Sequence, residues 1–180
     1  MDFLQLVQRR QSDRAYDATR PVEKEKIERI LEAARLAPSA CNGQPWHFIV
    51  VDDPDIKKEV AKACVAKALF MNHFTQQAPV HIIIVEEHTN ISSGIGGWIK
   101  KKEFPQVDIG IAAAHMVLAA QAEGLGSCMI GWFNEEKIKY ILGIPKNKRV
   151  LLDILIGYPT KPTREKRRKS MDEICSHNKY

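Results

Sequence analysis

The stretch PSACNGQPWHF, residues Pro38–Phe48, joins a region with helical periodicity to a run of strand-forming residues. A turn at this point needs Gly43 and Asn42, which tolerate the backbone conformations of tight turns. It does not also need Ser39 and Gln44 directly ahead of a proline and a tryptophan. Binding residues concentrate in loops held between rigid elements. Two interpretations stay open here: a ligand-binding loop, or a polar turn whose tryptophan is buried in the core.

The segments on either side of this loop predict helices packed on a sheet. Before it, residues 27–34 carry apolar side chains at i, i+3, i+4 and i+7, the pattern of an amphipathic helix that Pro38 ends. After it, WHFIVV is typical of a buried strand. PVHIIIV, SCMIGW and VLLDILIGYP have the same apolar, β-branched character. Helical patterns separate these strands irregularly, which favours an α/β or α+β class.

One predicted helix, residues 107–123, has almost no polar face. Between Ile109 and Gln121 only His115 and Gln121 itself are polar. A helix that is apolar all round must be buried all round. Either the core of one chain or a subunit interface could bury it. The polar tail from Thr160 to Tyr180 favours the interface, because its few apolar residues have little core of their own to join.

Composition indicates one globular domain with a trailing arm. The chain has 180 residues, 44% of them hydrophobic, and 27 Lys and Arg against 22 Asp and Glu give a formal charge of +5. This mild excess suits nucleic acid or a phosphorylated cofactor equally well. The four cysteines form no C-x-x-C pair, so we expect reduced thiols. With no signal peptide and no membrane-spanning stretch in sight, we expect a cytoplasmic protein.

Several kinds of catalytic site are excluded by their missing motifs. The sequence has no H-E-x-x-H, no G-x-S-x-G and no P-loop, and its six histidines lack metal-ligand spacing. Two glycine clusters, Gly94–Gly97 and Gly124–Ser127, are not in the strand–loop–helix order of a dinucleotide-binding fingerprint. No metal site is therefore expected, and no Rossmann site.

Three clusters could carry function. Arg10, Ser12 and Arg14 follow the first helix and could hold a phosphate through charge-assisted hydrogen bonds, or simply be a solvated helix end. The second cluster is the Pro38–Phe48 loop. The third is the basic run KPTREKRRK, residues 161–169, which is a solvated tail or a nucleic-acid patch. No aromatic residues interleave this run, which disfavours single-strand binding.

Together the clusters resemble the FMN-dependent nitroreductase family. Five motifs show this resemblance, and they follow one another along nearly the whole chain. They are Arg-Arg-x-Ser-x-Arg, Ala-Pro-Ser-x-x-Asn-x-Gln-Pro-Trp, Gly-Leu-Gly-Ser, Gly-Tyr-Pro and the basic tail. The resemblance implies an α+β sandwich in which helices flank a mixed, mostly antiparallel sheet. It also implies a single domain over residues 1–180 and a homodimer that binds two FMN at its interface. The arm, about residues 160–180, would reach the partner subunit.

The same resemblance implies which residues touch the cofactor. Arg10, Ser12 and Arg14 match residues that hold the phosphate and ribityl end, and Lys166 and Arg168 match positions that complete the phosphate site. A second set matches residues that lie against the flavin ring, partly from the other subunit: Pro38, Ser39, Asn42, Gln44, Ile130 and Gly131. No side chain is expected to be catalytic, because the cofactor carries the chemistry.

The implied activity is transfer of a hydride from NAD(P)H through FMN to a nitroaromatic, a quinone or a similar small electrophile, by a ping-pong mechanism. Two other classes stay open. One is a non-enzymatic flavin-binding or redox-sensing protein, and the other is a basic nucleic-acid-binding domain. Two departures from the family pattern stand out. Gln11 replaces another basic or polar residue, which we expect to change little, and Cys41 lies inside the flavin loop.

Overall fold

The computed structural model describes residues 2–65, 71–87 and 104–180. Its centre is a four-stranded sheet in the order β1-β2-β4-β3. The strands are β1 (Trp46–Val51), β2 (Val80–Glu86), β3 (Gly126–Ile130) and β4 (Arg149–Gly157). Neighbouring strands pair antiparallel, with Ile82 opposite Ile154 and Ile130 opposite Asp153. The four expected strands and the α+β class are confirmed, and the described strands include no parallel pair.

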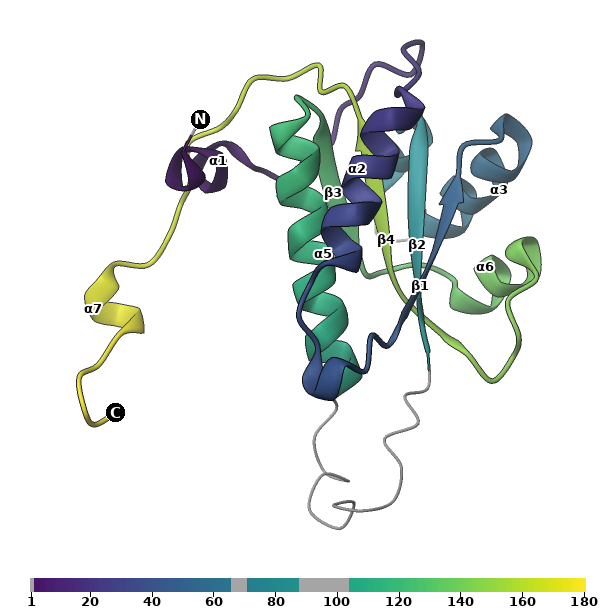
Figure 1. Cartoon of the computed structure of the whole chain (residues 1–180). Helices are drawn as coiled ribbons and strands as arrows, with labels where there is room; N and C mark the ends of the chain where they lie inside the picture. Colours follow the sequence, from purple (N-terminus) through teal and green to yellow (C-terminus); the bar gives the residue numbers. More distant parts are fainter. Residues whose placement is uncertain (1, 66–70, 88–103) are drawn as a thin grey trace, which may run out of the picture.

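Helices cover both faces of this sheet (Figure 1). On one face lie α2 (Lys24–Arg35) and α5 (Phe104–Ala122), and on the other lie α3 (Pro54–Cys64) and α6 (Glu135–Leu142). The remaining described elements lie outside these layers or connect them: α1 (Phe3–Arg9), η1 (Ala40–Asn42), η3 (His73–Gln77) and α7 (Met171–Ile174).

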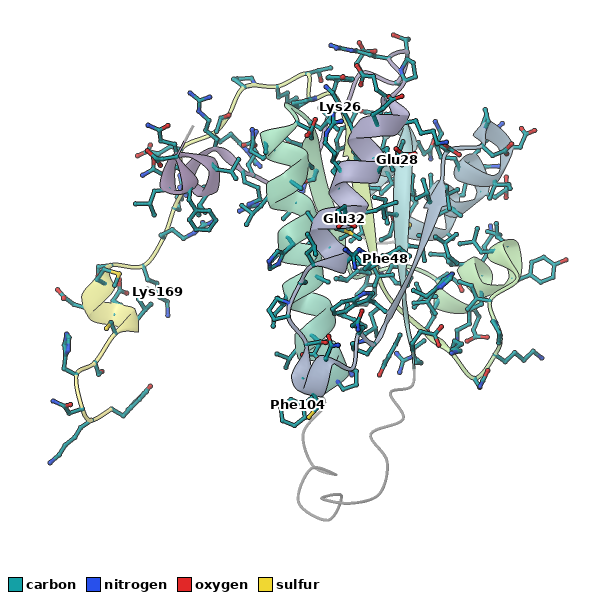
Figure 2. The ribbon with its side chains drawn as sticks, in the orientation of Figure 1. Lys26, Glu28, Glu32, Phe48, Phe104 and Lys169 are labelled. Atoms are coloured by element: carbon teal, nitrogen blue, oxygen red, sulfur yellow. The ribbon has the colours of Figure 1, made fainter. Side chains whose placement is uncertain are left out.

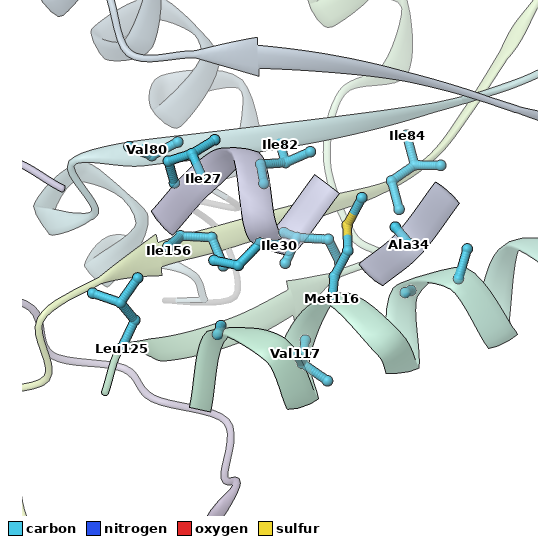
Figure 3. Close-up of a cluster of buried hydrophobic side chains, with 14 of the residues drawn as sticks. Ile27, Ile30, Ala34, Val80, Ile82, Ile84, Met116, Val117, Leu125 and Ile156 are labelled. Carbon is cyan, nitrogen blue, oxygen red and sulfur yellow. The ribbon is translucent and has the colours of Figure 1, made fainter. Parts of the chain in front are cut away.

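The alternation of side chains along β2 explains why the sheet needs both layers. Ile82 and Ile84 pack towards α2 and α5, whereas Ile83 and Val85 pack towards α3 and α6. Successive strand residues point to opposite faces, so a strand covered on both sides is apolar at nearly every position. The exception in β2 is the buried His81, whose ring nitrogens are hydrogen-bonded to Asp153 and to the Thr75 carbonyl oxygen. Figure 3 shows the hydrophobic cluster on the side of α2 and α5, in which Ile30 and Met116 pack against the sheet.

Local capping signals fix the helix ends. Asp2 and Gln5 form a capping box at α1, and the Asp53 side chain accepts hydrogen bonds from the first turn of α3. Asn134 caps α6 through a hydrogen bond from the Lys137 N–H. Gly124, just beyond α5, has a positive φ, as its expected place after the helix requires.

The described residues do not bury the long helix α5 on all sides. It begins at Phe104, before the predicted start, and buries seven side chains including Met116 and Ala120. Its opposite side leaves Val107 61% exposed, and there an apolar groove of about 580 Å³ runs between α5 and α1. The apolar sequence of α5 therefore serves a core on one side and an uncovered surface on the other.

The arm, residues 160–180, leaves the body and crosses the ends of α5 and α1 (Figure 1). Every arm residue except Lys166 is exposed, and α7 has no buried residue. Figure 2 shows Lys169 on the arm, clear of the sheet and its helices.

Candidate functional site

The segment Arg10–Arg14 is held in place by the start of β3. The Asp13 N–H donates to the Ser127 carbonyl oxygen at 2.8 Å, and the Ser127 N–H donates to Asp13 Oδ2 at 3.3 Å. A Cβ at Gly126 would lie 2.8 Å from that same carboxylate oxygen, so only glycine allows this approach. This contact explains the second glycine of the Gly-Leu-Gly-Ser sequence, whose last two residues begin β3.

The arm returns to this segment and closes a pocket with it. Arg164 Nη2 donates to the Ser12 carbonyl oxygen at 2.9 Å, and Lys166 Nζ donates to the Arg10 carbonyl oxygen. The resulting pocket has a volume of about 610 Å³. Its lining residues are Arg10, Gln11, Ser12, Arg14, Arg164, Glu165, Lys166, Arg167 and Arg168. Two regions more than 150 positions apart in sequence thus form one site, here called the basic pocket.

The charges of the basic pocket are unbalanced. Six basic side chains line it against the single carboxylate of Glu165. Burial, and then the positive charges of Arg10 and Arg168, lower the pKa of the Lys166 ammonium below its ordinary value. Burial raises the pKa of the nearby Asp13 carboxyl, against the opposing effect of its hydrogen bond from Gln11. A donor set of guanidinium, ammonium and hydroxyl groups with excess positive charge fits a phosphate group.

The second predicted cluster, here called the amide loop, comprises residues 38–45 ahead of β1. Cys41, Asn42 and Gln44 have positive φ values of 51°, 54° and 46°, whereas Gly43, the expected turn residue, has φ −68°. Left-handed backbone costs a residue with a side chain about 1–2 kcal/mol. Three such residues within four positions show a backbone held in an unfavourable shape, a feature that clusters at functional sites.

Two anchors hold the amide loop. Its Ala40 N–H donates to both carboxylate oxygens of Asp108 on α5 at 3.1 Å, and the Ser39 hydroxyl accepts from the Gln44 N–H at 3.0 Å. The ring of Trp46 stacks on Phe48 and packs against the core, while Asn42 and Gln44 stay exposed. The tryptophan is thus partly buried, as the polar-turn interpretation expects, but the amides face outward, as a binding loop requires.

The pair Ile130–Gly131, also predicted to lie against the flavin ring, is found at the end of β3. Ile130 is buried and Gly131 is exposed, and a Cβ added at Gly131 would meet no atom closer than Leu152 Cδ2 at 4.0 Å. The pair follows Ser127 on the same edge strand, about 10 Å further along at the usual rise of a strand. Ile130 thus lies on the same strand as Ser127, the residue that holds the pocket segment.

The basic pocket and the amide loop lie at opposite ends of α5. The loop is tied to Asp108 near the beginning of the helix, and Ser127, which holds the pocket segment, follows its end. A 19-residue helix is about 28 Å long. The structure thus brings together Arg10, Ser12, Arg14, Lys166 and Arg168, but within one chain it keeps them apart from Pro38, Ser39, Asn42 and Gln44.

Some residues of the site were not individually assigned a role from the sequence. Gln11, Arg164 and Arg167 line the basic pocket, and Asp108 anchors the amide loop. The role of Asp108 could have been suspected from the sequence, because it is a carboxylate near the start of an otherwise apolar helix. The Gly94–Gly97 cluster lies outside the described residues. Within the described ranges no group of histidine, cysteine and carboxylate side chains could hold a metal ion.

Comparison with known proteins identifies the family. The sequence model of the nitroreductase family matches residues 7–71 and 66–158. The chain belongs to the nitroreductase family. A protein of Archaeoglobus fulgidus, provisionally named an NADH dehydrogenase/NAD(P)H nitroreductase, is 33% identical over 162 residues, which cover 88% of this chain and 86% of that protein. The expected class, a nitroreductase-type oxidoreductase, is confirmed by these matches.

Solved structures agree with this family. A nitroreductase family protein of Clostridium difficile 630 is 31% identical, with a TM-score of 0.82 and full coverage of both chains. An FMN-dependent nitroreductase of Clostridium difficile R20291 is 28% identical, with a TM-score of 0.78 and coverage of 99% of this nitroreductase family member and 100% of that chain. In the described part of the chain, no helix combines the length and the apolar content that a membrane span needs.

Proposed function

We propose that this protein is an FMN-dependent oxidoreductase, and that the basic pocket holds the cofactor's phosphate. The observation that supports this most is the excess of basic side chains that Arg10–Arg14 and the arm bring to one pocket of about 610 Å³. The named FMN dependence of a nitroreductase of similar fold supports the same cofactor. If Arg10–Arg14 were only a solvated basic surface, its backbone would not need to be fixed by the close approach of Gly126 to the buried Asp13 carboxylate.

In this proposal Arg10, Arg14, Lys166 and Arg168 bind the phosphate, and Ser12 lies at the ribityl end. When bound, FMN would supply the redox chemistry, taking a hydride from NAD(P)H and reducing a nitroaromatic, a quinone or a similar electrophile. Gly131, which is exposed just beyond the buried Ile130, would let the ring approach the backbone at this end of β3. The protein's own part is to bind and orient, and no side chain is assigned a catalytic role.

We further propose a homodimer in which the amide loop of one chain meets the flavin held by the other. This arrangement is supported by the distance between the basic pocket and the amide loop of one chain, which lie at opposite ends of α5. A phosphate in the basic pocket therefore lies far from the amide loop of the same chain. The apolar groove beside α5, with Val107 and Phe3 61% and 66% exposed, supplies a surface that a second copy would cover. Residues 1–180 would form a single domain, whose arm extends to the partner subunit.

Steady-state kinetics on purified protein tests the activity. We expect flavin to copurify with the protein. We also expect the protein to oxidise NAD(P)H with a nitro or quinone acceptor and to give parallel double-reciprocal plots, because both substrates would use one flavin face in turn. Intersecting plots without competition between the substrates would contradict the shared face. Bound flavin without turnover would favour a redox-sensing protein, and colourless protein that binds nucleic acid would overturn the cofactor assignment.

A further inference from the structure

The side-chain amide of Gln11 joins the body of the protein to its arm. Its Nε2 donates to Asp13 Oδ1 at 2.9 Å and to the Pro162 carbonyl oxygen at 3.3 Å. Its Oε1 accepts from the Arg164 backbone N–H at 3.1 Å and from Arg164 Nε at 3.4 Å. The donor and the acceptor end of one amide are both in use, so neither a carboxylate nor an aliphatic side chain could replace all four contacts.

The arm has few other means of staying in place. Within the described residues, its remaining hydrogen bonds to the body run from Thr160, Arg164 and Lys166 to backbone carbonyl oxygens of Ala15, Ser12 and Arg10. No arm residue is fully buried, so apolar packing within the chain adds little. Gln11 is therefore the body side chain to which the first part of the arm is hydrogen-bonded, and the other acceptors are main-chain groups.

A neutral amide at position 11 suits the charges around the contact between the body and the arm. The six basic side chains of the pocket repel one another, and a carboxylate at position 11 would hold Arg164 but cancel part of the positive field. It would also face the Asp13 carboxylate across 2.9 Å. Gln11 fixes the arm while leaving the pocket's positive charge free for an anion. The sequence alone suggested that this residue would matter little, and it could not show the partners on the arm, which are 151 and 153 positions away.

We infer that Gln11 is a positioning residue for phosphate recognition: its amide docks the arm so that Lys166 and Arg168 face the anion bound by Arg10 and Arg14. The identity of that anion as the phosphate of FMN rests on the proposed function. The docking itself is a property of the protein and can be measured without it.

The experiment compares Gln11→Leu with Gln8→Leu, a matched change on the exposed face of α1 away from the pocket. Two quantities are measured for each variant and for wild type: the dissociation constants of FMN and riboflavin, and the rate at which trypsin releases the C-terminal peptide by cutting within residues 161–169. For Gln11→Leu we expect FMN affinity to fall about tenfold, riboflavin affinity to stay the same, and arm cleavage to accelerate. Gln8→Leu should match wild type in both measurements.

Arg164→Ala provides a second variant if Gln11→Leu lowers stability. Since Gln11 and Arg164 share a contact, the losses of FMN affinity in a double-mutant cycle should not add. Unchanged FMN affinity and unchanged arm cleavage in Gln11→Leu would overturn the inference, as would an equal loss of riboflavin affinity. Wild-type protein that binds no FMN would overturn the proposed function instead, and faster arm cleavage in Gln11→Leu would then still support the docking role.

Discussion

At the scale of single residues, the amide loop combines backbone strain with exposed polar groups. Its left-handed positions fall on Cys41, Asn42 and Gln44 although a glycine is available between them. Asparagine tolerates this conformation better than most residues, so Asn42 combines a permitted backbone with an amide that can meet a ligand. Gln44 Nε2 donates to Asn42 Oδ1 at 3.2 Å, which orients the two amides together.

Substitution of Asn42 separates these two roles. Asn42→Ala should weaken FMN binding by about 1–3 kcal/mol, because a polar edge of the ligand loses its partner. Asn42→Gly relieves the left-handed strain but also removes the amide, so it should lose as much FMN affinity while keeping the melting temperature of the apoprotein. If only the alanine variant lost affinity, backbone shape and not the amide would be responsible.

The pKa of Lys166 predicts how FMN affinity depends on pH. Burial and the charges of Arg10 and Arg168 lower this pKa from 10.5, so the free protein loses the ammonium proton at a lower pH than an ordinary lysine does. The phosphate of FMN binds the charged ammonium of Lys166 more tightly than the neutral amine. As pH rises through the lowered pKa, FMN binding should therefore weaken by about 1.5–3 kcal/mol, the worth of a charge-assisted hydrogen bond.

Lys166→Arg is the matched control, because a guanidinium stays charged well beyond this range. Its FMN affinity should not fall in the window where the wild type loses affinity. Riboflavin, titrated in parallel, corrects for protonation of the ring itself. The same pH dependence for riboflavin and FMN would mean that Lys166 does not touch the phosphate.

At the scale of elements, close approach of β3 to the Arg10–Arg14 segment sets the pocket's position. Gly126→Ala would place a methyl group 2.8 Å from Asp13 Oδ2, and this carboxylate is buried and hydrogen-bonded. We expect a loss of about 1–3 kcal/mol in the free energy of unfolding, together with weaker FMN binding. The measurements are chemical denaturation and FMN titration.

Asp13→Ala supplies the control for this clash. In an Asp13→Ala background the added methyl group has room, so Gly126→Ala should cost clearly less there than in the wild type. Equal costs in both backgrounds would show that the glycine is needed for a reason other than the approach of Asp13.

Helices and strands were predictable from the sequence because their signals are local. The apolar, β-branched run of β2 and the capping residues Asp2, Asp53 and Asn134 act over a few residues, and the structure contains the strand and the caps. The site was less predictable because its contacts are not local. Gln11 acquires its role only when the arm folds back, and nothing in the letters CNGQ shows that Gly43 would be right-handed while its neighbours are not.

At the scale of the whole molecule, α5 shows the limit of pattern analysis most clearly. Its apolar composition requires burial, but a single sequence cannot say whether its own chain or a second copy provides it. On one side of α5, Met116 and Ala120 enter the core of the same chain. On the other side, the described residues leave Val107 and the groove beside it uncovered. A charge in that groove should therefore separate subunits without unfolding them.

Ala114→Glu tests this expectation, since Ala114 lines the groove and is exposed within the single chain. We expect light scattering to report a monomer, with far-UV circular dichroism unchanged and FMN binding lost along with the dimer. Gln8→Glu adds the same charge outside the groove lining and should remain dimeric. A wild-type protein that is monomeric with flavin fully bound would contradict both the interface and the two-chain site.

A mixed dimer decides whether each flavin site is built from two chains. One chain carries Arg10→Ala and Arg14→Ala in the basic pocket, and the other carries Asn42→Ala and Gln44→Ala in the amide loop. If a site combines the pocket of one chain with the loop of its partner, the mixed dimer contains one site with both defects and one with none.

We therefore expect the mixed dimer, isolated through two different tags, to bind one FMN with wild-type affinity, although each parent homodimer binds weakly at both sites. If pocket and loop of the same chain formed the site, each site would carry one defect and no wild-type affinity would return. The helix-length separation of the two clusters along α5 favours the first result, because a loop tied to Asp108 at one end of the helix cannot also lie beside Ser127 at the other.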